Sequence, residues 1–560
     1  MRCLFHRACW ALLLVCVISG CATTESTTHS PVKVEVAAAT VHPLATAAAE
    51  AAVQRGGNAI DAAVAAALTL NVVDGHNSGI GGGCLMLIHT ADGRNIAIDG
   101  REVAPAAAYR NLYVRNGQVD TDASKTGALA SGVPGALAAY DMAVSEYGRL
   151  RLADALRPAA DLAERGYPLS AIGAQRLASV ADTMRKFPAA ARIFLDRHGD
   201  PLKAGDTLKQ RDLAITFRAI ADGGIDWFYR GPFAKRCAVW MRDNGGILSE
   251  ADFAGYKAVQ REPIVGQYRG FTIIGFPPPS SGGTHVAQIL NILENFNLAR
   301  MPAAQRAHVM VEAMKLAFAD RAYWLGDSDF VDVPSGLVDP SYGKALAKKI
   351  DINHVTEVPD HGTPPNSNSY FFGGNHTTHL SVADSEGNWV AITATINTSF
   401  GSKVVIPDTG VVMNNEMDDF SIQPGVPNAF GLVGAEANAV VARKRPLSSM
   451  SPTIVLGPRG NVVFSCGAAG GPTIITQVVQ TIVNHIDLLM PMRQAVGAPR
   501  LHHQWKPDRV LVESDMPAEL IDGLKQYGHT VKLRDRIGFS QAVEQQGDRF
   551  NSVSDPRLSE

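Results

Sequence analysis

The chain has 560 residues, of which 46% are hydrophobic and 19% are charged. This length can bury a large core without disulfides or metal ions, and the composition excludes collagen, a coiled coil and wholesale disorder. The net charge of −3, from 51 Lys and Arg against 54 Asp and Glu, gives no electrostatic reason to expect a nucleic-acid partner.

The N-terminus resembles the signal of a bacterial lipoprotein. Arg2 and Arg7 flank the start of an apolar run, residues 8–18, that is too short to span a membrane as a mature helix. Small residues then lead to Cys21, which implies cleavage before Cys21 and attachment of lipid to it. We therefore expect a signal peptide over 1–20, a tether over 21–40, and a periplasmic protein of the bacterial cell envelope that is held to the membrane through Cys21. An ordinary secretory signal is the alternative.

Only three cysteines lie beyond this leader, namely Cys84, Cys237 and Cys466. They are far apart in the sequence, and no CxxC spacing suggests a zinc ribbon or a dithiol redox site. Buried free thiols are the prediction, although an oxidising compartment could join two of them.

Helices dominate the predicted first half. Apolar periodicity and glycine stops predict helices over 44–55 and 58–70, and an Asp-Gly turn predicts a hairpin of 84–90 with 95–99. The middle, 150–353, has the pattern of a mainly helical region. Residues 354–376 are rich in Pro, Asn and Gly without any period, so we expect a mobile segment there.

The second half carries a strand pattern. Segments 378–383 and 389–395 alternate and are joined by a turn centred on Glu386, which would place Thr377 opposite Thr395 with Asn397 on the same face. This inference depends on the register, since a slip of one residue reverses the faces. A second hairpin over 453–466, followed by a helix over 473–487, indicates a layered α/β body.

Several familiar sites are absent from the sequence. It contains no GxxxxGK[ST], no GxGxxG after a strand, no HExxH and no GxSxG. His502 and His503 have no third ligand at metal spacing, so they are interpreted as structural. No cofactor and no metal ion are predicted.

The junction of the mobile segment with the next strand suggests a nucleophile. A threonine hydroxyl needs a base within reach, and an α-amine of pKa near 8 provides one if the preceding peptide bond is cut. Thr377 would attack the carbonyl of His376, shift the acyl group from nitrogen to oxygen, and be freed by hydrolysis. A strand that simply begins with Thr-Thr after a loop is the alternative, and these residues alone leave it open.

An ordered set of motifs resembles the γ-glutamyltranspeptidase family, from about Val41 to the C-terminus. The motifs are DGRE (99–102), LASGVPG (129–135), PPPSSGG (277–283), NHTTH (375–379), NNEMDDF (414–420), RPLSSMSPT (445–453), Gly-Gly (470–471) and SDPR (554–557). The resemblance implies an αββα sandwich of the N-terminal-nucleophile hydrolase type. It also implies a precursor that cuts itself between His376 and Thr377 into a large subunit, 41–376, and a small subunit, 377–560, which stay together as a heterodimer.

The resemblance further implies the activity and the roles of individual residues. The γ-glutamyl group of glutathione or of γ-glutamyl amides would be transferred to water, amino acids or dipeptides through an ester on Thr377. The Thr395 hydroxyl would support the nucleophile, and Gly470 and Gly471 would form the oxyanion hole. The binding roles divide by charge: the donor's α-carboxylate would meet Arg101, Ser448 and Ser449, and its α-ammonium would meet Glu416, Asp419 and the Asn397 carbonyl.

Two alternatives remain open at this point. The same fold could act as a glutaryl-type cephalosporin acylase, although that donor has no ammonium group for Glu416 and Asp419 to bind. The chain could also be an uncleaved lipoprotein that binds γ-glutamyl peptides. In residues 424–437, which resemble the family's lid, Phe430 stands where a tyrosine is often found.

Overall fold

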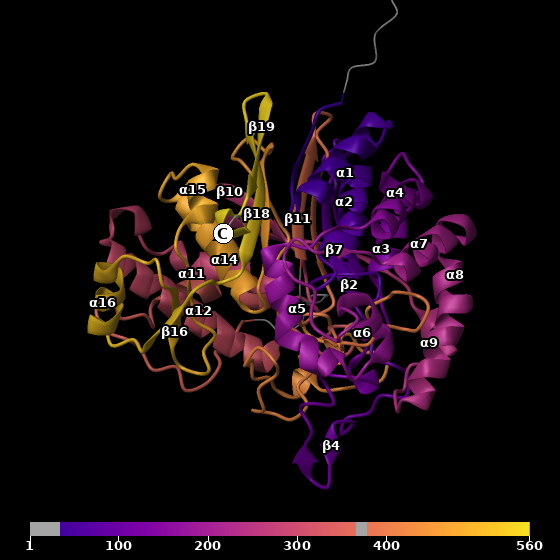
Figure 1. Ribbon diagram of the computed structural model, residues 1–560. Helices are drawn as coiled ribbons and strands as arrows, with labels where there is room; N and C mark the ends of the chain where they lie inside the picture. Colours follow the sequence, from indigo (N-terminus) through magenta and orange to yellow (C-terminus); the bar gives the residue numbers. More distant parts are fainter. Residues whose placement is uncertain (1–33, 366–377, 559–560) are drawn as a thin grey trace, which may run out of the picture.

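The computed structural model describes residues 34–365 and 378–558. Two β-sheets lie face to face at its centre, with helices α1–α9 on one side and α11–α16 on the other (Figure 1). This is the predicted αββα sandwich, and within the described residues no helix is both long enough and apolar enough to cross a membrane.

The first sheet has six antiparallel strands in the order β1-β11-β12-β2-β3-β8. Their bounds are β1 Val36–Ala39, β11 Thr378–Asp384, β12 Trp389–Thr395, β2 Gly83–His89, β3 Asn95–Gly100 and β8 Val259–Arg261. The second sheet, also antiparallel, has the order β19-β18-β14-β13-β10-β9. Its strands are β19 Arg549–Ser554, β18 Phe539–Gln546, β14 Val462–Ala469, β13 Thr453–Leu456, β10 Phe271–Gly275 and β9 Ile264–Tyr268.

Side chains of both sheets meet in one apolar layer, which includes Leu85, Trp389 and Ile454. The alternate residues of the same strands, such as Met86, point to the helices on the outer face. The central strands β2 and β12 are mainly apolar, because both of their faces are buried.

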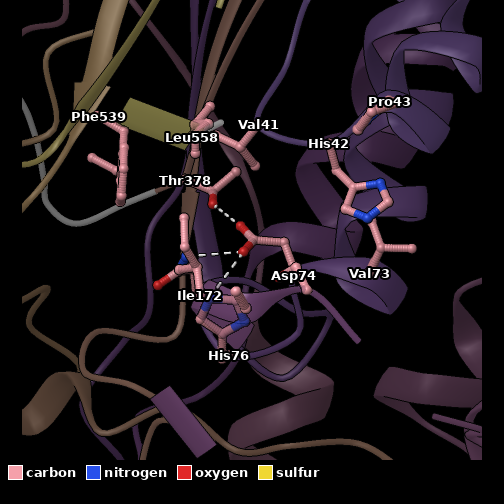
Figure 2. A pocket seen from close by; sticks show the side chains of 14 residues that line it. Val41, His42, Pro43, Val73, Asp74, His76, Ile172, Thr378, Phe539 and Leu558 are labelled. Carbon is pink, nitrogen blue, oxygen red and sulfur yellow. Dashed lines mark hydrogen bonds and ion pairs between the residues drawn. The ribbon is translucent and has the colours of Figure 1, made fainter. Parts of the chain in front are cut away.

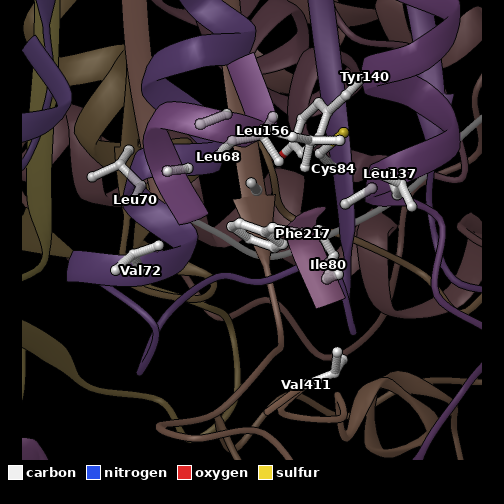
Figure 3. Close-up of a cluster of buried hydrophobic side chains, with 14 of the residues drawn as sticks. Leu68, Leu70, Val72, Ile80, Cys84, Leu137, Tyr140, Leu156, Phe217 and Val411 are labelled. Atoms are coloured by element: carbon white, nitrogen blue, oxygen red, sulfur yellow. The ribbon is translucent and has the colours of Figure 1, made fainter. Parts of the chain in front are cut away.

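Helices α1–α10 belong to the half that covers the first sheet. They are α1 Pro43–Gln54, α2 Ala59–Val73, α3 Ala136–Tyr147, α4 Leu152–Arg165, α5 Ala171–Met184, α6 Pro188–Phe194, α7 Arg211–Gly223, α8 Asp226–Tyr229, α9 Pro232–Asp243 and α10 Glu250–Gly255. Figure 3 shows the core between α2 and its neighbours, where Leu68, Leu156 and Phe217 come together.

The remaining helices cover the second sheet. They are α11 Ser281–Leu293, α12 Ala303–Trp324, α13 Pro340–Ala347, α14 Thr473–Ile486, α15 Met492–Gly497 and α16 Ala518–Gln526. A small sheet of β15 Leu501–His502, β16 Val510–Glu513 and β17 Val531–Arg534 flanks them, and two short ribbons pair β4 Val114–Arg115 with β5 Gln118–Val119 and β6 Tyr167–Pro168 with β7 Thr207–Leu208.

Helix α2 is held to the central hairpin by Asp384, the last residue of β11. This buried carboxylate accepts the N–H of Ala59 at 2.8 Å and the N–H groups of Glu386 and Asn388 at 3.0 Å each. The start of α2 and the turn between β11 and β12 therefore share one acceptor, which fixes the hairpin against the helix.

Most predicted elements are confirmed. The predicted helices at 44–55 and 58–70 correspond to α1 and α2, and the three predicted hairpins are β2–β3, β11–β12 and β13–β14. Cys84, Cys237 and Cys466 are buried free thiols, as expected.

Two expectations were wrong, and a third was incomplete. The predicted tether reached residue 40, but β1 (Val36–Ala39) is already an edge strand paired with β11. The middle region is mainly helical, as predicted, but it also contains β8, β9 and β10, because short apolar runs such as 271–275 cannot be told from helix by period alone. The segment expected to be mobile, 354–376, is anchored in its described part, where Val355 donates its N–H to the Tyr527 carbonyl.

Candidate active site

The hairpin of β11 and β12 carries the register that the sequence predicts. Thr378 lies opposite Ala394, and Thr395 ends β12. The numbers of these partners have the sum expected from a symmetric turn, so the predicted register is confirmed for the described residues. Thr377 and His376, the predicted nucleophile and cleavage site, lie outside the described residues, as does Cys21.

Two predicted side chains come at the end of β12. The Thr395 hydroxyl is fully buried and accepts the backbone N–H of Asn397 at 2.6 Å. Because an N–H group can only donate, the hydroxyl keeps its own proton for a further acceptor. Asn397 has a φ of 74° and donates Nδ2–H to the Asn415 carbonyl at 2.9 Å. Its buried Oδ1 accepts no hydrogen bond from any described residue, so an incoming N–H group would satisfy it.

A buried ion cluster surrounds Arg101, the residue that follows β3. Its Nη1 lies 3.0 Å from the Glu102 carboxylate and 2.8 Å from that of Glu416, and its Nη2 donates to Asp419 at 2.8 Å. Chain packing brings these groups together from strand β3 and from the 3₁₀ turn Glu416–Asp419, more than 300 residues apart.

The charges in this cluster do not balance. Three carboxylates share one guanidinium, and all four side chains are nearly inaccessible to solvent. Burial outweighs the attraction of Arg101 and raises the pKa of Glu102 and of Glu416 to about 8 each. Burial also raises the pKa of Asp419, and Glu416 adds to that shift. Part of the acid in this cluster is therefore protonated at neutral pH.

Ser448 and Ser449 form a buried pair of hydroxyls. The Ser448 Oγ accepts the N–H of Met450 at 3.1 Å, and the Ser449 Oγ accepts an N–H of Arg321 at 3.3 Å. These N–H groups can only donate hydrogen bonds, so each serine oxygen acts as the acceptor. Each serine hydroxyl proton therefore remains available for another acceptor. Two such protons are suited to bind an anion.

The PPPSSGG run, 277–283, supports these serines. Ser281 donates its backbone N–H to the Ser448 carbonyl at 2.9 Å, and Ser280 donates its hydroxyl to the Met450 carbonyl at 2.6 Å. A Cβ on Gly282 would lie only 2.0 Å from that carbonyl oxygen, so only glycine allows this close approach. The motif thus shapes the serine loop.

Gly470 and Gly471 follow β14 directly and precede α14. Both have positive φ angles, 137° and 64°, which expose their backbone in a tight turn. A Cβ on Gly471 would lie 2.7 Å from the ring of Phe430. The segment that resembles a lid therefore packs on the predicted oxyanion glycines through an apolar ring.

A cavity of about 260 Å³ opens beside the start of β11 (Figure 2). Thr378 and Ala469, both on its wall, directly adjoin positions 377 and 470 in the chain. Within it the Thr378 hydroxyl donates to Asp74, and His76 Nε2 lies 3.3 Å from the other carboxylate oxygen. Burial lowers the pKa of His76. Asp74 thus anchors the first described residue of β11 to the end of α2.

One further group of side chains has a metal-like composition. His308, Glu312 and His529 bring their ligand atoms within 4.8 Å of one another. However, the Lys315 ammonium lies 2.7 Å from Glu312 Oε1, and the two imidazoles form a 2.7 Å hydrogen bond. Lysine supplies the positive charge here, so the group fits a structural polar cluster rather than a metal site.

Sequence reasoning missed three residues close to the predicted site. Glu102 was noticed only as part of a motif, while Arg321 and Asp74 were not considered. Arg321 lies on α12, where charged residues occur inside a helix whose residues 307–321 are all buried. Charges on every face of an apolar helical stretch are the signal that could have identified it.

The chain is similar to known proteins over nearly all of its described length. The Gamma-glutamyltranspeptidase family pattern matches residues 45–560. The chain is 43% identical over 512 residues to the glutathione hydrolase proenzyme of Escherichia coli (strain K12), covering 90% of this chain and 87% of that protein. It is 37% identical over 511 residues to the Acylase ACY 1 proenzyme of Pseudomonas sp. (strain SE83), covering 89% and 87%. Among solved structures, the cephalosporin acylase from Bacillus halodurans superposes with a TM-score of 0.83 at 27% identity, over 94% of this chain and 95% of that one.

The raised pKa values in the Arg101 cluster predict a pH-dependent stability. Because the pKa of Glu102 is about 8 when folded and near 4.3 when unfolded, the folded chain binds more protons between these values. Its contribution to stability is complete below pH 4.3 and is lost as the pH rises through 8. We expect the urea midpoint to fall from pH 5.5 to 8.5, because the free energy of unfolding decreases by up to about 1.4 kcal/mol per pH unit for each proton.

Glu102→Gln should flatten this pH dependence. The exposed Glu436→Gln, at a carboxylate whose pKa is lowered, is the matched control and should leave the slope above pH 6 unchanged. Equal slopes in wild type and Glu102→Gln would contradict the assignment.

Proposed function

Because the chain belongs to the gamma-glutamyltranspeptidase family, we propose that it acts as a self-processing glutathione hydrolase and γ-glutamyltransferase. The acyl donor is glutathione or another γ-glutamyl amide, and the acceptor is water or an amino-group compound. The observation that carries this function is the 2.8 Å contact of Arg101 with Asp419. An α-amino acid bears its ammonium and its carboxylate on the same carbon atom. The protein groups that bind them must therefore lie next to each other, as Arg101 and Asp419 do.

The proposed binding residues form two groups, one for each charged group of the donor. Its α-carboxylate is proposed to meet Arg101 and the free hydroxyl protons of Ser448 and Ser449. Its α-ammonium is proposed to meet Glu416, Asp419 and the unpaired Oδ1 of Asn397. Burial of all these groups strengthens each contact.

Self-processing begins at Thr377. Its hydroxyl oxygen attacks the His376 carbonyl, the C–N bond breaks as the ester C–O bond forms, and the hydroxyl proton passes to the departing nitrogen. Water then hydrolyses the ester, leaving a carboxylate on His376 and a free α-amine on Thr377. This amine, of pKa near 8, is the base that the nucleophile lacked.

Turnover uses the same atoms. The α-amine takes the Thr377 hydroxyl proton as the oxygen attacks the γ-carbonyl, and the leaving amine departs with a proton. Gly470 and Gly471 are proposed to donate backbone N–H groups to the oxyanion, an interaction whose loss typically costs about 100- to 1000-fold in rate. Water or an acceptor amine then takes the γ-glutamyl group from the ester.

Cleavage need not separate the two fragments. The first sheet joins β1, β2, β3 and β8 of the large fragment to β11 and β12 of the small one. The second sheet joins β9 and β10 to β13, β14, β18 and β19. Separating the fragments would dismantle both sheets, which supports a heterodimer as the mature form.

Thr377→Ala is expected to abolish both self-cleavage and turnover, because it removes the attacking oxygen. Denaturing gels of the purified variant should show one band where the wild type shows two. Thr377→Ser, which retains a hydroxyl, is the control and should still be cleaved. Normal processing of Thr377→Ala would refute the mechanism.

The donor preference distinguishes the hydrolase from an acylase. We expect hydrolysis of γ-glutamyl-p-nitroanilide to exceed that of glutaryl-p-nitroanilide by at least about 100-fold in kcat/KM, since glutaryl leaves Asp419 and Glu416 without an ammonium. Asp419→Asn should narrow this ratio by lowering the γ-glutamyl rate. A wild-type preference for the glutaryl donor would instead support the acylase.

Attachment to a membrane through Cys21 is a further proposal, supported by the signal-like sequence that precedes this residue. Protein made in a bacterial host with its own leader should carry a diacylglycerol on Cys21, detectable by mass spectrometry of the N-terminal peptide. Cys21→Ala should release it from the membrane fraction. An unmodified N-terminus downstream of Cys21 would contradict the anchor.

A further inference from the structure

We infer that Arg321 is a positioning residue for the donor's α-carboxylate. Through the Ser449 hydroxyl it turns a proton toward the substrate, and it places a second positive charge beside the one on Arg101. The inference rests on the proposed function and adds a residue to its carboxylate subsite.

The contacts of Arg321 determine the direction of the serine proton. Its Nη2 donates to Ser449 Oγ at 3.3 Å and lies 3.5 Å from the Ser448 carbonyl oxygen, while its Nε donates to Ser281 Oγ at 2.9 Å. A guanidinium cannot accept a hydrogen bond, so Ser449 can use only its lone pair toward Arg321. The hydroxyl proton must then point to another acceptor, and a carboxylate is the strongest that a substrate offers.

Arg321 also differs from the other buried arginines, because it forms no ion pair with any described residue. Arg101, Arg261, Arg445, Arg500 and Arg557 each lie within 4.0 Å of a carboxylate. No carboxylate in the described part of the chain lies that close to Arg321, which is only 4% exposed. Burial lowers the pKa of Arg321 to about 10, although the attraction of Asp419 opposes this shift, so the guanidinium stays charged at neutral pH. A buried cation without a contacting carboxylate is costly, and an anionic ligand would offset that cost.

The position of Arg321 fits this ligand. Arg321 and Asp419 line one cavity of about 20 Å³, together with Asn428 and Leu432 of the lid-like segment. The Asn428 amide reaches the Asp419 carboxylate at 3.4 Å. This space holds no more than about one water molecule, but it shows that a cation and the proposed ammonium acceptor are neighbours.

Arg101 alone has too few free N–H groups to bind the α-carboxylate of the donor substrate. Its Nε donates to the Pro446 carbonyl, its Nη1 serves Glu102 and Glu416, and its Nη2 serves Asp419. Of the five N–H groups of a guanidinium, one therefore remains. A bidentate fork to the substrate is unavailable in this arrangement, so additional donors are needed, and Ser449 held by Arg321 provides one.

The test compares two donors that differ only in the α-carboxylate. They are L-γ-glutamyl-p-nitroanilide and 4-aminobutyryl-p-nitroanilide, which retains the ammonium group. Arg321→Met should lower kcat/KM for the first by about 10- to 100-fold, mainly through KM, and for the second by less than about 3-fold. Arg321→Lys, which keeps the charge but not the planar fork, should restore part of the discrimination. The exposed Arg300→Met is the matched control and should change neither rate.

The possible results test three claims separately, namely the role of Arg321 in carboxylate binding, its coupling to Ser449, and the proposed function. An equal loss for both donors in Arg321→Met would show a purely structural role and overturn the inference. If that variant does not fold, Arg321→Lys and Ser449→Ala are measured singly and together. Their effects on kcat/KM for the γ-glutamyl donor should be less than additive. Full additivity would overturn the coupling of Arg321 to Ser449. Wild-type protein that hydrolyses neither anilide would instead overturn the proposed function, and this inference with it.

Discussion

The antiparallel pairing of β11 with β12 is the constraint on which the site depends. Even positions of β11, such as Thr378 and Leu380, face the α2 side, where Thr378 meets Asp74. Odd positions face β14: a Cβ on Gly467 would lie 2.4 Å from the ring of His379. If this alternation continues by one residue, we expect a threonine at position 377 to face β14, which ends at Ala469 directly before the predicted oxyanion glycines. A slip of one residue would turn it toward the helices instead.

Charge burial is the second organising feature. The interior carries Arg101 with three acids in contact and Arg321 with none within 4.0 Å among the described residues, and both arginines contact the segment that holds the predicted serines. Burying such charges costs free energy of folding, and so does burying the Asn397 side-chain oxygen, which accepts no hydrogen bond from the described residues. Under the proposed function, a zwitterionic donor would pair with these groups. Its binding energy and its specificity would then both come from the charge imbalance, which an apolar or singly charged donor would not relieve.

The sequence was informative where a local pattern has one physical meaning. Alternation around Glu386 gave the hairpin and its register, and the Gly-Gly pair after a strand marked a tight turn. Charges brought together over long distances were harder to predict. Nothing near Arg101 in the sequence indicates that Glu102 and residues more than 300 positions away would all share its guanidinium. Arg321 was not predicted for the same reason, since its proposed role depends on Ser449. Strand β10 was not predicted because a buried strand of five residues has no distinct period.

Edman sequencing or intact mass of the smaller fragment from purified, active protein tests the central claim most directly. The account predicts a fragment that begins with Thr377 and runs to the C-terminus, in equal amount with a larger fragment that ends at His376. Active protein that consists of a single unbroken chain, or a fragment that begins at any other residue, would contradict it.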